Sequence, residues 1–152
     1  WRSMEFINYM QIALDEAKFA RSRGEVPIGA VIVSASGEII SRAGNRTREL
    51  SDPSAHAELL AIREACQRLN SQRIPDYDLY VTLEPCGMCA GVIAHARIRR
   101  LYIGAADPKS GGVLHGARIF EQPQSHHKPE VYDGISDREC ELLIKSFFKG
   151  LR

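Results

Sequence analysis

Four residues in two short segments have the types and spacing of a metal site. Glu58 follows His56 by two positions, and Cys86 and Cys89 lie three apart in a Pro-Cys-Gly-Met-Cys run. Imidazole and thiolate are ligands that zinc prefers. A structural zinc site closes with four protein ligands, whereas a catalytic site has three and keeps its fourth position for water. The pattern therefore predicts a zinc hydrolase with His56, Cys86 and Cys89 as ligands and Glu58 as proton carrier.

Two other interpretations of these residues stay open. A Cys-x-x-Cys motif also occurs as a thioredoxin-like redox pair, but that interpretation leaves His56 and Glu58 unexplained. A structural zinc site needs a fourth ligand, and the sequence suggests none at comparable spacing. The remaining histidines, for which we expect roles other than ligation, are His95, His115, His126 and His127.

Apolar periodicity predicts the elements that carry these residues. The expected strands span residues 26–33, 38–44, 78–83, 99–105 and 130–134. Two expected helices span residues 5–23 and 52–69. A third is expected to begin at residue 86 and a fourth at residue 136. His56 and Glu58 would lie in or beside the first turn of the second helix, and Cys86 and Cys89 would open the third. Helix starts favour negative charge, so the first segment suits a zinc-bound hydroxide, and the second favours the thiolate form of the cysteines that binds metal.

Local signals refine this outline. Gly29 inside a strand predicts that another backbone or a ligand passes close by. Asp52-Pro53 is a typical start for the second helix, and Ser136 with Glu139 predicts a capping box at the last one. Phe6 is expected on the apolar face of the first helix. Cys66 and Cys140 are expected to be buried and unpaired.

The alternation of strands and helices after an initial hairpin predicts an α/β fold, a three-layer α/β/α sandwich. A chain of 152 residues with 44% hydrophobic and 26% charged residues is typical of one globular domain. We expect that domain to span residues 4–152, and residues 1–3, which precede Met4, to be an addition to the natural chain. The first twenty residues show neither an export signal nor a membrane span, so we expect a cytoplasmic protein.

Further blocks extend the metal motif over most of the chain: EVPIGAV at 25–31, AHAE at 55–58, LYVTLEPCGMCA at 79–90 and GAADPKSG at 104–111. With them, the sequence resembles the bacterial tRNA-specific adenosine deaminases of the cytidine deaminase superfamily. Cytidine and guanine deaminases share the central motif, so the outer blocks favour tRNA. The resemblance implies the cytidine-deaminase-like fold with a five-stranded mixed sheet. It also implies one Zn²⁺ per subunit and a homodimer.

The resemblance further implies hydrolytic deamination of the wobble adenosine in a tRNA anticodon to inosine, with Glu58 transferring the protons. It places Asn45 against the flipped nucleoside, Ile28 and the Ala57 backbone in the pocket wall, and Asp107 and Lys109 near the flanking nucleotides. Without the resemblance, Asn45 and Asp107 would be interpreted as turn residues and Lys109 as a solvated charge. Between residues 112 and 128 the match to the family weakens.

The net charge of +1 does not indicate a nucleic-acid-binding protein. Basic residues do cluster locally, although a solvated charged face is the ordinary explanation of each cluster. The clusters are Arg42, Arg46 and Arg48; Arg97, Arg99 and Arg100; and Lys145, Lys149 and Arg152. Phe147, Phe148, Lys149 and Arg152 could form an RNA-facing wall, although paired phenylalanines on a last helix are more often part of the core. The rival functions are a deaminase of free bases or nucleotides, and an inactive, zinc-stabilised RNA-binding module.

Overall fold

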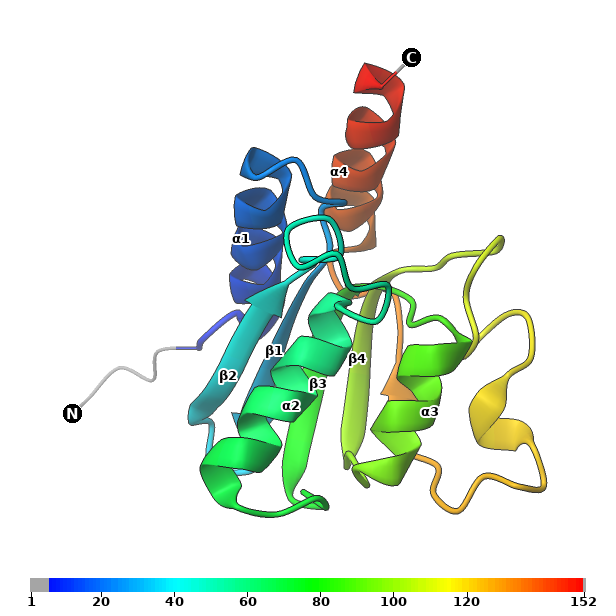
Figure 1. The fold of residues 1–152 in the computed structure, drawn as a ribbon. Helices are drawn as coiled ribbons and strands as arrows, with labels where there is room; N and C mark the ends of the chain where they lie inside the picture. The colour runs from blue at the N-terminus through cyan, green and yellow to red at the C-terminus, as the bar shows by residue number, and fades with distance from the viewer. Residues whose placement is uncertain (1–5, 152) are drawn as a thin grey trace.

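A mixed five-stranded sheet forms the middle of the computed structural model, which describes residues 6–151 (Figure 1). The strands are β1 (Gly29–Ser34), β2 (Ile39–Gly44), β3 (Tyr77–Leu83), β4 (Arg100–Ala105) and β5 (Glu130–Tyr132). Their order in space is β2-β1-β3-β4-β5. β1 pairs antiparallel with β2 and β3, whereas β4 pairs parallel with β3 and β5. The predicted mixed sheet is confirmed.

Helices cover both faces of the sheet. They are α1 (Tyr9–Ser22), α2 (Ala57–Leu69), α3 (Gly87–His95) and α4 (Asp137–Gly150), with a 3-10 turn η1 (Ile119–Glu121). In Figure 1, α2 and α3 lie in front of the sheet and α1 and α4 behind it, which confirms the three-layer sandwich. No helix within residues 6–151 is long and apolar enough to cross a membrane. The expectation for residues 1–3 lies outside the described residues.

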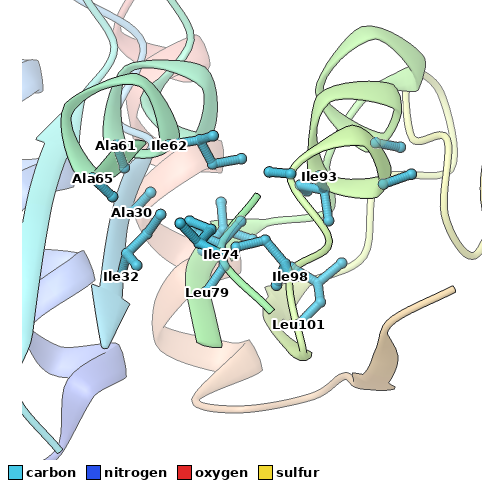
Figure 2. Packing of buried hydrophobic residues seen from close by; sticks show 14 of the residues in the cluster. Ala30, Ile32, Ala61, Ile62, Ala65, Ile74, Leu79, Ile93, Ile98 and Leu101 are labelled. Atoms are coloured by element: carbon cyan, nitrogen blue, oxygen red, sulfur yellow. The ribbon is translucent and has the colours of Figure 1, made fainter. Parts of the chain in front are cut away.

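Alternating side chains of the central strands pack into two separate hydrophobic cores, one on each face of the sheet. Ala30 and Ile32 on β1 join the cluster beneath α2 and α3, which Figure 2 shows. Val31 and Val33 point to the opposite face and pack in the cluster formed with α1 and α4. A strand that is apolar on both sides is expected where helices cover both faces of a sheet. The front core anchors the helices whose N-termini carry the predicted metal ligands.

Gly29 lies where β1 touches helix α1, as the sequence predicts. A Cβ atom at this position would overlap the Ala13 carbonyl oxygen and lie 2.7 Å from the Ala17 amide nitrogen. Its backbone N–H donates to Thr82 Oγ1 at 3.1 Å. Only glycine permits this approach, so the close contact of two backbones is confirmed.

The first helix begins later than the periodicity predicts. Asn8 caps it, with its Oδ1 accepting the Gln11 N–H at 3.1 Å, and the first helical residue is Tyr9. The expected start at residue 5 lies outside the described residues. Phe6 precedes the helix and is 86% exposed, so its assignment to the core-facing stripe is wrong. The asparagine cap satisfies an N–H group that would otherwise have no partner, and this fixes the start.

Helix α2 begins at Ala57 rather than at Asp52-Pro53. Asp52 Oδ1 instead accepts the backbone N–H of Ser54 at 2.9 Å and its hydroxyl at 2.7 Å. This local aspartate turn competes with capping, which is why the Asp-Pro signal gave the wrong start. As a consequence, His56 occupies the N-cap position, and Glu58 lies in the first turn.

The predicted capping box of the last helix is wrong. Ser136 is the N-cap residue, but its backbone is left-handed, with φ of 55°, and its side chain makes no capping hydrogen bond. The acidic Asp137 and Glu139 lie in the first turn, where they complement the helix dipole. Charge rather than side-chain capping therefore stabilises this helix start.

All four cysteines are free thiols. Cys140 is 1% exposed, in agreement with its predicted burial. Cys66 is only half-buried, so its predicted full burial is wrong. Cys86 and Cys89 lie in the site described next.

Candidate metal centre and active site

Two helix N-termini bring His56, Cys86 and Cys89 together. His56 is the N-cap of α2 and Cys86 the N-cap of α3, and Cys89 lies in the first turn of α3. His56 Nδ1 lies 3.6 Å from Cys86 Sγ and 3.5 Å from Cys89 Sγ. Their ligand atoms all lie within 4.8 Å of one another. The structure therefore assembles residues that are far apart in the sequence into one potential ligand group.

The spacing of these atoms fits a tetrahedral metal. Zn–S bonds of about 2.3 Å and Zn–N bonds of about 2.0 Å at tetrahedral angles imply an S···N separation of about 3.5 Å. The two observed S···N distances agree with that value. Within residues 6–151 this is the single group of three or more such side chains that could hold a metal ion. The other four histidines lie outside it, as the sequence predicts.

The two thiols differ: the hydrogen bond to Cys86 and burial raise the pKa of the Cys89 thiol, whereas the Cys86 thiol is electrostatically prepared to be a ligand. Hydrogen bonds from the Cys89 thiol and the His56 ring lower the pKa of the Cys86 thiol to about 3. Thiolate is the form that binds metals. Both sulfur atoms contact the same imidazole nitrogen, a geometry that the redox-pair interpretation does not account for.

Glu58 lies beside this group, and one of its two carboxyl oxygens lacks a hydrogen-bond partner. The residue is 3% exposed, and burial raises the pKa of its carboxyl to about 7. Its Oε1 is the single buried side-chain oxygen or nitrogen within the described residues that has no hydrogen-bond partner. An unpartnered buried polar atom is costly to the folded state, so it indicates a group kept for binding or chemistry.

A cleft of about 1070 Å³ opens onto the group. His56, Glu58 and Cys86 contribute to its floor, and Ile28 lines it from the segment before β1. The loop of residues 107–110 also lines the cleft, and it includes the sequence-predicted Asp107 and Lys109. Most of the predicted site residues thus meet at one opening.

Asn45 and Ala57 adjoin residues that line the cleft but are not part of its lining themselves. Asn45 is 5% exposed, and its Oδ1 accepts the Ala57 backbone N–H at 2.9 Å. Its own N–H donates to the Ile28 carbonyl at 3.2 Å. Asn45 therefore fixes the start of α2 relative to β1, a structural contact that the sequence did not predict.

Residues 4–105 match the cytidine and deoxycytidylate deaminase zinc-binding region. The chain is also 54% identical over 148 residues to a tRNA-specific adenosine deaminase from Agrobacterium fabrum, covering 97% of each sequence. The chain belongs to the tRNA-specific adenosine deaminase family.

Solved structures agree with this assignment of the deaminase. One, from work on A-to-I editing by tRNA:A34 deaminases at the wobble position of transfer RNA, superposes with a TM-score of 0.87 at 56% identity. That match covers 89% of this chain and 97% of the other. The X-ray structure of a guanine deaminase from Bacillus subtilis is less similar, with a TM-score of 0.65 at 31% identity and 85% of each chain covered.

Helix α4 supplies a wall of the deaminase cleft that the sequence indicated only in part. Lys145 and Phe148 line the cleft, and Phe148 is 49% exposed. Phe147 packs edge-on against Phe148, with ring centroids 5.3 Å apart. Asp137, Glu141 and Ile144 also line the cleft, and the sequence gave no signal for them. Arg152, which was grouped with this wall, lies outside the described residues.

All six residues of the two arginine clusters are in ion pairs or backbone contacts. Arg42 pairs with Glu16 at 2.6 Å, and Arg46 with Glu49. In the second cluster, Arg99 pairs with Asp78 at 2.8 Å and Arg100 with Glu130 at 2.6 Å. Arg97 donates to the Ala94 carbonyl, and Arg48 to that of Gly24. This pattern supports the ordinary interpretation, a neutralised charged surface, over a dedicated nucleic-acid patch.

Proposed function

We propose that the protein is a zinc-dependent hydrolase that deaminates adenosine to inosine at the wobble position of a tRNA anticodon. The observation that carries the proposal is the convergence of a three-residue metal group and an unpartnered buried carboxylate on one open cleft. Membership of the family supports the choice of substrate.

His56, Cys86 and Cys89 would hold the metal, and the group fits zinc by its donor types and its spacing. Bound zinc would act as a Lewis acid and make water nucleophilic at neutral pH. Three protein ligands rather than four leave room for that water. We propose one zinc ion per subunit on the same ground.

Glu58 would carry the protons. In hydrolytic deamination, water adds its oxygen to C6 of the purine and ammonia leaves, so two proton transfers are needed. Glu58 would accept a proton from the attacking water and give it to the neighbouring ring nitrogen. It would then take the remaining proton from the added hydroxyl group and pass it to the departing amino group, so that ammonia leaves as the C6 carbonyl forms. Its burial beside the metal group and its lack of another partner support this role.

Substrate contacts follow from the walls of the cleft. A wobble adenosine is splayed out of an anticodon loop and can enter a pocket without breaking a duplex. Ile28 would pack against the base, and the Ala57 backbone with Asn45 would complete the pocket behind it. No hydrogen bond of the Asn45 side-chain nitrogen is found among residues 6–151, which leaves it for the nucleoside. Asp107 and Lys109 would face the flanking nucleotides.

The deciding experiment compares deamination of an anticodon stem-loop carrying a wobble adenosine with deamination of free adenosine, cytidine and guanine. We expect inosine in the RNA and no turnover of the free compounds. Turnover of a free base alone would replace the tRNA assignment with the rival free-base deaminase. Binding of the stem-loop without any turnover would instead favour the inactive RNA-binding module.

Three further features complete the proposal. The resemblance supports a homodimer, which light scattering of the purified protein tests directly. We take residues 4–152 as one deaminase domain, since both cores and the cleft draw on elements from α1 to α4. A tRNA substrate places the activity in the cytoplasm, where anticodons are read.

A further inference from the structure

A buried carboxylate outside the metal group joins the two sides of the cleft. Glu84 follows strand β3 and stands two residues before Cys86, and its side chain is fully buried. We propose that Glu84 is a positioning residue: it fixes the substrate-facing loop, residues 107–110, against the turn that carries the metal-binding cysteines. This inference rests on the proposed deaminase function.

The Glu84 carboxylate is saturated with donors from a single loop. Oε1 accepts the Asp107 N–H at 3.0 Å and the His115 ring nitrogen at 2.8 Å. Oε2 accepts the backbone N–H groups of Val113, Leu114 and His115, at 3.3, 3.0 and 3.1 Å. A carboxylate has about four acceptor sites, so no capacity is left for a substrate. Glu84 therefore acts through the loop and not on the reacting atoms.

The same loop is bonded to the metal-binding turn. The Gly112 N–H donates to the carbonyl of Pro85, the residue before Cys86, at 2.8 Å. The Glu84 N–H in turn donates to the Ala105 carbonyl at the end of β4, also at 2.8 Å. Glu84 thus lies at the junction of β3, β4, the cysteine turn and the loop, and a shift of its carboxylate would move the loop relative to the cysteines.

Two glycines let the loop approach this closely. A Cβ atom on Gly111 would overlap Glu84 Oε2 and lie 2.5 Å from the Asp107 carbonyl oxygen. A Cβ atom on Gly112 would lie 2.6 Å from the Gly87 amide nitrogen at the start of α3. Gly111→Ala therefore perturbs the same junction as a change of Glu84 does, but from the side of the loop.

The test uses the full chain loaded with zinc, at a temperature where every variant is folded. In Glu84→Gln, one oxygen becomes an NH₂ group that faces N–H donors. We expect kcat/KM on the anticodon stem-loop to fall by about 100-fold, the cost of a displacement near 1 Å. Most of the loss should be in KM, because residues 107–110 face the substrate, and zinc content should equal that of the wild type.

Gly111→Ala should also lower kcat/KM mainly by raising KM. The variant with both substitutions should lose no more kcat/KM than either single variant, because both substitutions disturb the same junction. Glu25→Gln is the matched control. Glu25 is also a buried carboxylate that accepts backbone N–H groups, but the residues it holds, 47–49, do not line the cleft. Its KM should equal that of the wild type.

The outcomes separate the two proposals. A wild-type protein without turnover would contradict the proposed function. A wild-type protein that turns over, with Glu84→Gln unchanged in KM or with losses that add in the double variant, would contradict the positioning role alone. If Glu84→Gln does not fold, His115→Gln removes one of the five donors and leaves the carboxylate. Its KM should rise by only about threefold, less than the full worth of a hydrogen bond to a charged group, because four donors still hold the carboxylate; an unchanged KM would overturn the proposal.

Discussion

Glu58 and Glu84 are both almost fully buried, yet their surroundings are opposite. Glu84 accepts five hydrogen bonds, whereas Glu58 has an oxygen with no partner. Burial opposes ionisation of Glu84, but the Asp107 N–H and the His115 ring outweigh it and lower the pKa of its carboxyl. At Glu58, burial prevails and raises the pKa to about 7. The number of hydrogen bonds that the carboxylate accepts, and not its burial, distinguishes a structural carboxylate from one that is available for chemistry.

Glu25 extends the comparison to the other side of the molecule. It is 1% exposed and accepts the N–H groups of Arg48 at 3.1 Å and Glu49 at 2.8 Å. It thus holds the connection between β2 and α2 in the way that Glu84 holds the loop after β4. These two saturated carboxylates fix the segments around the unsaturated one, which predicts that replacing them has different consequences from replacing Glu58.

The largest effect on turnover with the fold and the metal site kept intact is expected for Glu58→Gln. Loss of the proton carrier should lower turnover of the stem-loop by at least about 10³-fold, within the range of general acid–base catalysis. Zinc content should not change, since the three ligands remain. The unfolding temperature should be equal to or higher than that of the wild type, because a neutral amide costs less to bury than a carboxylate. Single-turnover kinetics, metal analysis and thermal unfolding measure the three quantities.

Either of two results would contradict this interpretation of Glu58. Turnover within about tenfold of the wild type would remove its catalytic role. If Glu58→Gln lowered the unfolding temperature by as much as Glu84→Gln does, Glu58 would be a structural carboxylate as well.

Removing a metal ligand should abolish turnover and also destabilise the fold. Cys86→Ala leaves two ligands, so the zinc content should fall to background, and the free energy that metal binding adds to folding should be lost. Cys66→Ala is the matched control, since this half-buried thiol lies outside the ligand group. It should keep both zinc and turnover. A Cys86→Ala protein with wild-type zinc content would contradict the assigned ligand set.

The third prediction concerns the anchor away from the cleft. Glu25→Gln leaves the N–H groups of Arg48 and Glu49 facing an amide, and so should lower the free energy of unfolding by about 1–3 kcal/mol. Turnover at saturating RNA should stay at the wild-type level. Urea unfolding combined with steady-state kinetics tests this separation of stability from activity. A loss of turnover without a loss of stability would contradict the structural role of Glu25.

The parts of this structure that the sequence predicted are those with local signals. The metal motif and the apolar periodicity indicated His56, Cys86, Cys89 and the sheet, because ligand chemistry and side-chain alternation are encoded within short windows. Glu84 could not be recognised in this way, because four of its five partners are backbone N–H groups 23 to 31 residues away in the sequence. Backbone donors leave no trace in residue type. The same limit applies to Asn45, whose partner is the Ala57 N–H.

The smallest predicted effect is a change in the acid dependence of stability. Burial opposes ionisation of Glu25, but the N–H groups of Glu49 and Arg48 and the Thr47 hydroxyl lower the pKa of its carboxyl below the ordinary 4.5. Because the folded pKa is below the unfolded one, the stabilisation from Glu25 is fully present above pH 4.5 and is lost as the pH falls through the folded pKa. Glu25→Gln has no carboxyl to protonate there.

The stability curve of Glu25→Gln should therefore be shallower in acid than that of the wild type. Urea unfolding of both proteins from about pH 7 to about pH 3 should show a difference that is largest near neutrality and shrinks below pH 4.5, by at most about 1.4 kcal/mol per pH unit. Contributions from Glu84 and from the metal ligands occur in both proteins and cancel in the difference. A difference that stays constant with pH would mean that Glu25 stabilises the loop by packing alone, and Glu25 would then no longer belong with Glu84 in the comparison.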